Sequence, residues 1–162
     1  MLEVRRKQVG MDASSSLRVA AELSELETIR RFVEQHATAL RIDPSAIDEL
    51  LLVVNEIATN SILHGYRKQP GTIEVAMRPI GDAVEIRVRD HAPPFDPTQA
   101  PSPDLHVPLA QRPLGGMGVH LVRQLIDSLT YRITPDGWNE LTLVKYRIVP
   151  HLPQEEPDGS NN

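Results

Sequence analysis

A proline-dense segment in the second half of the chain limits its fold more than any other feature. Between His91 and Pro113 the chain also contains Pro93, Pro94, Pro97, Pro101, Pro103 and Pro108. Proline fixes its own φ angle and has no N–H to donate, so neither a helix nor a central strand survives that density. A loop longer than about 12–15 residues inside a compact domain is usually functional or disordered. The sequence therefore predicts a long loop between two structured parts of the chain.

The first structured part opens with a strand and a helix. Residues 15–21 alternate apolar and polar side chains, as a half-buried strand does. Ser24 followed by Glu27 is a capping-box pattern, which typically begins a helix. Apolar residues then recur at helical spacing and predict a helix over residues 25–40. We expect residues 1–13, ahead of the strand, to form a flexible leader.

A second helix is predicted from Asp43 onward. Aspartate is a good N-cap, and Pro44 is tolerated at the first helical position because the N–H there has no partner in the helix. Gly65 is expected to end the helix. Its broad apolar stripe consists of Ile47, Leu50, Leu51, Val54, Ile57, Ala58 and Ile62.

Four further strands are expected. Residues 72–77 and 84–88 alternate on either side of a Gly-Asp turn and predict a hairpin with one buried face. After the long loop, a short amphipathic helix leads to strands at 129–133 and 141–148. The fold class is therefore α+β: a two-layer sandwich with a mixed or antiparallel sheet and helices on one face.

Composition limits the classes of partner and the cellular compartment. A length of 162 residues favours a single domain, and 40% apolar residues can build its core. The net charge of −5 disfavours direct nucleic-acid binding, which depends on Lys and Arg neutralising phosphates. No apolar run approaches the roughly 20 residues that cross a bilayer, so no membrane contact is expected. The chain has no cysteine, which suits a reducing cytoplasm.

Three polar residues lie along one side of the second predicted helix. Glu56, Asn60 and His64 are spaced four residues apart, so each step advances by only about 40° around the helix. They could form a solvated polar edge. Their chemistry also allows a function, because a carboxylate can accept a proton and an amide oxygen is a suitable ligand for Mg²⁺. We expect His64 to be structural, beside Gly65 at the helix end.

Two further features can take part in ligand binding. Asp90 ends an apolar strand, where it could cap the following turn or accept a hydrogen bond from an exocyclic amine. Gly115-Gly116-Met117-Gly118 precedes a helix, where glycines form a hinge or let the backbone approach a phosphate at the helix N-terminus. The pattern is neither a P-loop nor a dinucleotide fingerprint.

The order of these features resembles a known family. Glu56-Ile-Ala-Thr-Asn60-Ser-Ile-Leu-His64-Gly65-Tyr66 resembles the N-box of the GHKL (Bergerat-fold) ATPases, in the variant carried by anti-sigma-factor serine kinases. Asp90 to Pro97 resembles their first glycine box, and Gly115 to Val122 resembles the second. The resemblance extends from about Leu17 to Arg147. It implies a Bergerat-type sandwich over residues 14–149, with an ATP lid at about 91–114. Residues 150–162 are polar and proline-rich, so we expect them to form a disordered tail.

The resemblance also implies roles for individual residues. Glu56 would be the general base that takes a proton from an acceptor hydroxyl, and Asn60 would ligate Mg²⁺. Asp90 would receive the adenine amino group, and Arg112 would meet the γ-phosphate. The remaining nucleotide-binding positions would be Ala92 beside the base, Gly115, Gly116, Met117 and Gly118 around the phosphates, and Thr142 in the adenine pocket.

Ala92 departs from the family pattern, which has glycine at this position. If the position needs a positive φ, alanine costs roughly 1 kcal/mol or more there. If it needs only a close approach to the base, a methyl group is tolerated. The first case would favour a binding module over an enzyme.

The implied function is that of an ATP- and Mg²⁺-dependent serine/threonine protein kinase of the anti-sigma-factor type. Its partners would be an anti-sigma-factor antagonist with a STAS-type fold and a sigma factor, and strand 15–21 offers an edge for a homodimer. One alternative is an ATP-gated regulatory module that sequesters a partner without kinase activity. A detached histidine-kinase catalytic domain is disfavoured, since no long upstream helical hairpin offers an acceptor histidine.

Overall fold

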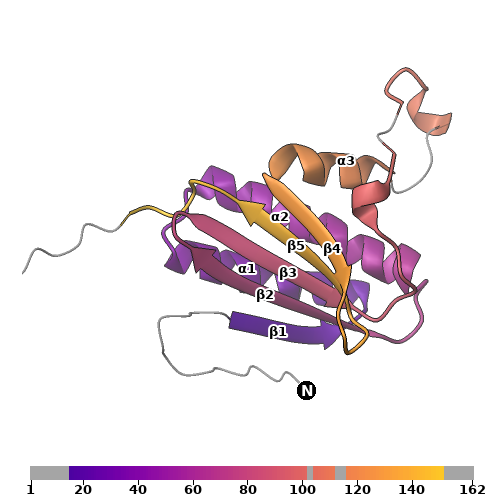
Figure 1. The fold of residues 1–162 in the computed structure, drawn as a ribbon, viewed down its shortest axis with the longest axis horizontal. Coiled ribbons are helices and arrows are strands. Elements are labelled where there is room, and N and C mark those ends of the chain that lie inside the picture. The colour runs from indigo at the N-terminus through magenta and orange to yellow at the C-terminus, as the bar shows by residue number, and fades with distance from the viewer. Residues whose placement is uncertain (1–14, 102–103, 112–115, 152–162) are drawn as a thin grey trace, which may run out of the picture.

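The computed structural model describes residues 15–101, 104–111 and 116–151, which form two layers (Figure 1). One layer is a five-stranded sheet of order β1-β2-β3-β5-β4, and the helices cover one of its faces. Every neighbouring pair of strands is antiparallel, so the mixed alternative does not apply. The elements are β1 (Ser15–Ala20), α1 (Leu26–Ala39), α2 (Pro44–Asn60), β2 (Thr72–Ile80), β3 (Ala83–Asp90), α3 (Gly116–Leu125), β4 (Ser128–Ile133) and β5 (Asn139–Lys145). The expected two-layer α+β class is confirmed.

The two long helices follow their apolar patterns. α1 buries Ile29, Val33 and Ala37, which lie three to four residues apart on one face. α2 is capped as predicted, because the Ser45 backbone N–H donates to Asp43 Oδ1 at 2.9 Å and Pro44 occupies the first turn. The core lies between these helices and the sheet.

The capping box predicted at Ser24 is wrong. A single 3₁₀ turn, Leu23–Glu25, precedes α1, so Ser24 already lies within helical backbone and cannot serve as an extended N-cap. The Ser24 hydroxyl instead faces the Glu22 carboxylate at 3.4 Å. Glu25 stands at the N-cap of α1 and makes no side-chain hydrogen bond to the first turn.

The predicted hairpin extends at both ends, to Thr72–Ile80 and Ala83–Asp90. The last strand begins two residues earlier and ends three residues earlier than expected, at Asn139 and Lys145. It ends there because the Tyr146 N–H donates to the Asp127 carboxylate at 2.7 Å and Arg147 takes a φ of 59°. Neither feature has a local sequence signal.

The described parts of the proline-dense segment form no strand and no α-helix. They contain only two single 3₁₀ turns, Pro97–Gln99 and Leu109–Gln111, which confirms the predicted irregular loop for those parts. The proposed leader, and the tail beyond residue 151, lie outside the described residues. No helix among the described residues is long and apolar enough to span a bilayer.

Candidate functional site

A wide turn at the end of α2 directs two residues toward the end of β3. Residues Ser61–Gly65 form a π-helical turn, closed by a hydrogen bond from the Tyr66 N–H to the Ser61 carbonyl at 2.7 Å. Single π turns occur frequently at functional sites. This turn brings the Ser61 hydroxyl within 2.6 Å of Asp90 Oδ2. The middle of the predicted N-box is therefore adjacent to the start of the predicted first glycine box.

The Asp90 carboxylate is held on both of its oxygens. Oδ2 accepts from Ser61, while Oδ1 accepts from the Ala92 N–H at 3.0 Å and from Asn139 Nδ2 at 2.8 Å. A carboxylate oxygen offers about two acceptor sites. Among the described residues Oδ2 has a single partner, so it retains an acceptor site for a donor on a ligand. The side chain is half-buried and fixed in orientation.

Asn139 is a site residue that the sequence did not indicate. It faces Asp90 across the β3–β5 pair and also donates from Nδ2 to the Ala92 carbonyl at 2.7 Å. Its Oδ1 accepts from the Tyr131 hydroxyl at 2.7 Å. Only the strand register reveals this placement, because Asn139 belongs to no recognised motif.

Thr142 does not lie with Asp90. It pairs with Arg87 of β3 and Thr130 of β4. Thr142 is three residues, an odd number, from Asn139, which pairs with Asp90. Successive residues of a strand point to opposite faces. Thr142 is therefore on the face away from the helices, and the register corrects the expectation that it lines the adenine pocket.

Two tyrosines support the residues around Asp90: Tyr66 contacts the segment that follows it, and Tyr131 contacts Asn139. The Tyr66 hydroxyl donates to the Thr72 carbonyl at 2.7 Å and accepts from the His91 N–H at 2.6 Å. Burial raises the pKa of Tyr66 above its ordinary value. Burial also raises the pKa of Tyr131, and the nearby charges of Asp90 and Asp96 raise it further. Both hydroxyls therefore stay protonated and able to donate at neutral pH.

The start of α3 lies against the polar side of α2. A Cβ built on Gly118 would stand 2.7 Å from Glu56 Oε2 and 3.5 Å from Asn60 Nδ2. The glycine thus leaves room for the Glu56 carboxylate, which is half-buried one helical turn from Asn60. The first turn of a helix presents unpaired backbone N–H groups to an anion. Gly116 and Met117 begin this turn.

Ala92 does not adopt the left-handed backbone that would penalise alanine. Its methyl group is buried against Gly65, where an added Cβ would come within 2.9 Å of the Ala92 Cβ. The methyl group therefore fits because position 65 has no side chain. The strained alternative for Ala92 does not apply.

Three positions from the sequence analysis remain: two lie outside the described part of the chain, and the third is His64. Arg112 and Gly115 lie outside the described residues. His64 is exposed at the π turn.

One residue that the sequence did not single out, Arg123 of α3, holds the first part of the loop. It donates from Nη1 to the Ala100 carbonyl and from Nη2 to the Pro97 carbonyl, both at 2.9 Å, and Nη2 also donates to the Thr98 carbonyl.

A shallow hollow of about 400 Å³ lies at the other end of the sheet and contains none of these residues. Asp82, Asp127, Tyr146 and Arg147 line it. Asp82 precedes β3 and Asp90 ends it, so the hollow and Asp90 are separated by the length of that strand. We place the candidate site at the Asp90 end, where the hydrogen-bonded residues and the glycine contact converge.

Comparison with known proteins identifies the family of the chain. The model of the histidine kinase-like ATPase domain matches residues 19–145. The serine/threonine-protein kinase BtrW of Bordetella bronchiseptica is 34% identical over 98 residues, which is 60% of this chain and 68% of that protein. The serine-protein kinase RsbW of Bacillus cereus is 23% identical over 80% of this chain and 82% of its own length. An anti-sigma F factor of Anoxybacillus flavithermus is 25% identical over 76% of this chain and 86% of its own length.

A solved structure shares the fold. The crystal structure of the RsbU and RsbW domains of Rv1364c from Mycobacterium tuberculosis superposes with a TM-score of 0.55 at 19% identity. The match covers 81% of this chain but 32% of that longer chain, so it supports the fold alone. From the family model, the relatives and the fold together, the chain belongs to the histidine kinase-like ATPase domain family, the GHKL group that includes the anti-sigma-factor serine/threonine kinases.

Proposed function

We propose that this chain is an ATP-dependent serine/threonine protein kinase that phosphorylates a small regulatory protein. The observation that carries the proposal is the meeting of three motifs at one end of the molecule. Gly118 at the start of α3 leaves room for Glu56, and Ser61, next to Asn60, bonds to Asp90. This proximity supports the proposal that Glu56 acts as the base, Asn60 as the metal ligand and Asp90 as the adenine acceptor of one site.

Nucleotide binding would use both ends of this site. Asp90 Oδ2 has an acceptor site for the adenine amino group, and its partners Ser61 and Asn139 fix its direction. The phosphates would lie at the N-terminus of α3, where glycine backbone allows close approach and the helix dipole favours negative charge.

The donor set also fits a magnesium ion. Mg²⁺ takes few protein ligands, keeps several waters and fills its shell from phosphates. Asn60 offers a neutral amide oxygen one turn from Glu56, and we propose that it holds the ion. When bound, the ion would neutralise phosphate charge.

The chemical step that we propose transfers the γ-phosphoryl group to a serine or threonine hydroxyl. The bond from the γ-phosphorus to the bridging oxygen breaks, and ADP leaves. A new bond forms between that phosphorus and the hydroxyl oxygen, and the hydroxyl proton passes to Glu56. Catalysis of this kind depends mainly on positioning and on electrostatic stabilisation.

The names of the relatives suggest the partners. Proteins called serine-protein kinase RsbW and anti-sigma F factor match most of this chain. We propose that the substrate is an anti-sigma-factor antagonist with a STAS-type fold and that a sigma factor is the competing partner. Exchange between the two would make the chain a partner-switching regulator.

The proposal is tested by phosphoryl transfer from labelled ATP to candidate antagonist proteins in the presence of Mg²⁺. We expect Glu56→Gln to lower transfer at least about a hundredfold while ATP affinity stays within about threefold. The exposed Glu34 on α1 gives the matched control, and Glu34→Gln should change neither quantity. If Glu56→Gln transfers phosphate as fast as the wild type, Glu56 is not the general base.

The alternative, a binding module gated by ATP, gives a different result in the same experiment. It binds ATP and Mg²⁺ but transfers phosphate to no partner. Under either function, Asn60→Ala should abolish the dependence of ATP binding on Mg²⁺. If titration calorimetry shows the same dependence in this variant, the metal assignment is wrong.

A further inference from the structure

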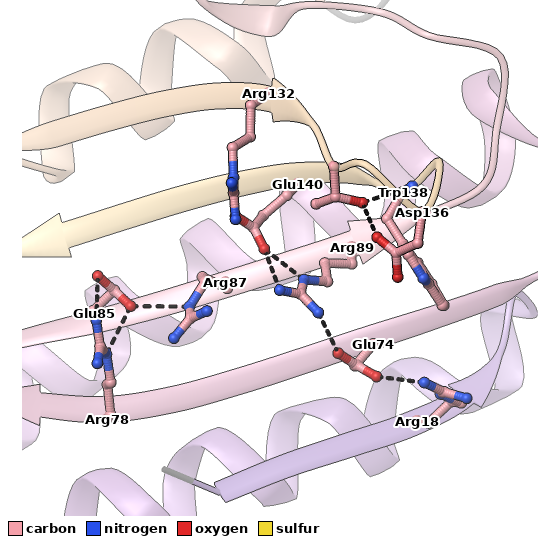
Figure 2. A network of polar contacts seen from close by, with 11 residues as sticks. Arg18, Glu74, Arg78, Glu85, Arg87, Arg89, Arg132, Asp136, Trp138 and Glu140 are labelled. Carbon is pink, nitrogen blue, oxygen red and sulfur yellow. Dashed lines mark hydrogen bonds and ion pairs between the residues drawn. The ribbon is translucent and has the colours of Figure 1, made fainter. Parts of the chain in front are cut away.

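The face of the sheet that points away from the helices carries a row of alternating charges (Figure 2). Its members come from all five strands: Arg18 of β1, Glu74 of β2, Arg89 of β3, Glu140 of β5 and Arg132 of β4. The N–O distances along the row are 2.7, 3.3, 2.5 and 2.6 Å. Each pair is joined directly across neighbouring strands, so the row is continuous.

A second, shorter cluster lies on the same face. Arg78 Nε and Arg87 Nε reach Glu85 Oε1 at 2.8 and 2.9 Å. We call the eight residues of the row and this cluster the open-face cluster. It contains five arginines and three glutamates, so it has a positive surplus on a chain whose net charge is −5.

The two signs lie at different depths. The Glu140 and Glu74 side chains are 3% and 17% exposed, whereas Arg132 and Arg18 at the two ends of the row are 61% and 57% exposed. Burial raises the pKa of Glu140, but hydrogen bonds from Arg132 and Arg89 outweigh it and hold that pKa below its ordinary value. The three glutamates of the cluster are therefore less exposed than its two outermost arginines, and guanidinium groups form most of the exposed part of the cluster.

The outer arginines keep donors for a further contact. A guanidinium has five N–H donors. In the described contacts Arg132 uses Nε toward Glu140, and Arg18 uses Nη2 toward Glu74. The Arg18 guanidinium also lies 5.3 Å from the centre of the Trp138 ring. That ring contacts the His91 ring in a tilted arrangement, with 3.8 Å between ring centres. Arginine and tryptophan are among the residue types enriched at the energetic hot spots of protein interfaces.

We propose that the open-face cluster docks an acidic protein surface, whose carboxylates take the outward donors of Arg18 and Arg132. Arginine suits this partner because its planar fork binds a carboxylate through two parallel hydrogen bonds. The net charge of −5 on the chain opposes a long phosphate backbone more than a local group of carboxylates on a protein. A second copy of the same face is also opposed, since two cationic surfaces would meet.

This docking surface is separate from the proposed catalytic site. Asp90 and Asn139 point to the helix side of the sheet, whereas the cluster occupies the alternate residues of the same strands. The inference therefore stands whether or not the chain is a kinase.

The test measures binding of a fluorescein-labelled oligoglutamate peptide to the full chain by fluorescence anisotropy at low salt. We expect Arg18→Glu combined with Arg132→Glu to weaken binding at least about tenfold. Arg31 on α1 is the matched control, because it is also exposed and paired with a glutamate. Arg31→Glu should change affinity less than about twofold.

A milder pair, Arg18→Gln with Arg132→Gln, keeps the test valid if charge reversal unfolds the sheet. It should also weaken binding, and thermal unfolding of each variant checks that the fold persists. Trp138 is the chain's single tryptophan, so its intrinsic fluorescence gives a second readout beside the cluster.

Several outcomes would overturn the proposal. One is absence of peptide binding, and another is equal binding by the wild type and both double variants. Tighter binding of duplex DNA, or of phosphatidylserine–phosphatidylcholine vesicles, through the same arginines would assign the face to another class of partner. A dimer in sedimentation that both double variants convert to a monomer would assign it to a second copy of this chain.

Discussion

At the scale of single residues, two glycines determine where the site's side chains can stand. Gly118 faces the tip of the flexible Glu56 side chain, while Gly71 lies against the rigid ring of Tyr66. A methyl group added at each position would meet a neighbour of different stiffness. Substituting alanine at Gly118 and at Gly71 should therefore have different effects on the protein.

Gly118→Ala should displace the Glu56 carboxylate and leave the fold nearly unchanged. We expect kcat for phosphoryl transfer to fall by about 10–100-fold, because small misplacements of a catalytic group have effects of this size. The free energy of unfolding should change by less than about 1 kcal/mol. Stopped assays with labelled ATP and urea unfolding measure the two quantities.

Gly71→Ala provides the contrast, since its methyl group meets the Tyr66 ring and should lower stability.

In the background of Glu56→Gln, Gly118→Ala should cost almost no further activity. If it does cost further activity there, Gly118 acts through something other than Glu56.

Gly65 and Ala92 share one small space. Gly65→Ala should destabilise the protein by about 1–3 kcal/mol, because its methyl group would meet that of Ala92. Ala92→Gly in the same chain should recover most of this loss. Urea unfolding of the two single variants and the double variant gives the coupling energy. Additive losses would show that the two methyl groups do not compete for the same space.

At the scale of secondary-structure elements, local patterns were sufficient wherever the element depended on its own residues. Asp43 caps α2 as predicted, and the alternating residues around Gly81 form the hairpin. The predictions failed where distant segments decide the structure. The early end of β5 depends on Asp127, and the π turn of α2 accompanies the bond from Ser61 to Asp90.

The residues of the candidate site also differ in whether the sequence alone could predict them. Glu56, Asn60, Asp90 and Gly118 belong to motifs that are continuous in sequence, and the structure brings these motifs together. Asn139 becomes apparent only from the pairing of β5 with β3, and that pairing also moves Thr142 to the other face. A strand's phase relative to its neighbours depends on register, which the strand's own sequence does not contain.

Arg123 connects α3 to the beginning of the proposed lid, and this contact can be tested at the level of the element. Arg123→Ala removes donors to the carbonyls of Pro97, Thr98 and Ala100. We expect hydrogen exchange at the Gln99 and Ala100 amides to accelerate at least about tenfold, because the turn loses its anchor. In kinase assays KM for ATP should rise more than kcat falls.

Arg123→Lys is the graded control for this prediction. Lysine keeps the charge but has a single nitrogen, so it cannot reach all three carbonyls in the geometry of a planar fork. It should give intermediate exchange rates. If amide exchange is unchanged in Arg123→Ala, the 3₁₀ turn at Pro97–Gln99 is stable without the hydrogen bonds from Arg123.

At the scale of the whole molecule, the charged row joins both edges of the sheet through one buried carboxylate. Glu140 receives hydrogen bonds from Arg89 of β3 and from Arg132 of β4, so it connects the central strands to the edge strand. Isolated surface ion pairs contribute little to stability. Glu140 differs because its side chain is almost fully buried, and removing it leaves two arginines without their shared partner.

Glu140→Gln should lower the free energy of unfolding at neutral pH by about 1–3 kcal/mol, because it replaces charge-assisted hydrogen bonds at a buried position. The pKa of Glu140 is held below its ordinary value of 4.5 in the folded protein. Its ionised form therefore stabilises the fold fully above that ordinary value, and the stabilisation is lost as pH falls through the lower, folded-state pKa.

The comparison of pH profiles isolates this residue from the other carboxylates. Denaturant unfolding from pH 7 downward should show the wild type and Glu140→Gln converging in acid, since protonated Glu140 and glutamine are then nearly equivalent. Glu27→Gln, which removes an exposed pair with Arg31, should run parallel to the wild type throughout. A constant gap between wild type and Glu140→Gln across the acid range would mean that the ionised carboxylate does not stabilise the sheet. The row would then be only a surface feature, and the depth difference between its signs would have no energetic consequence.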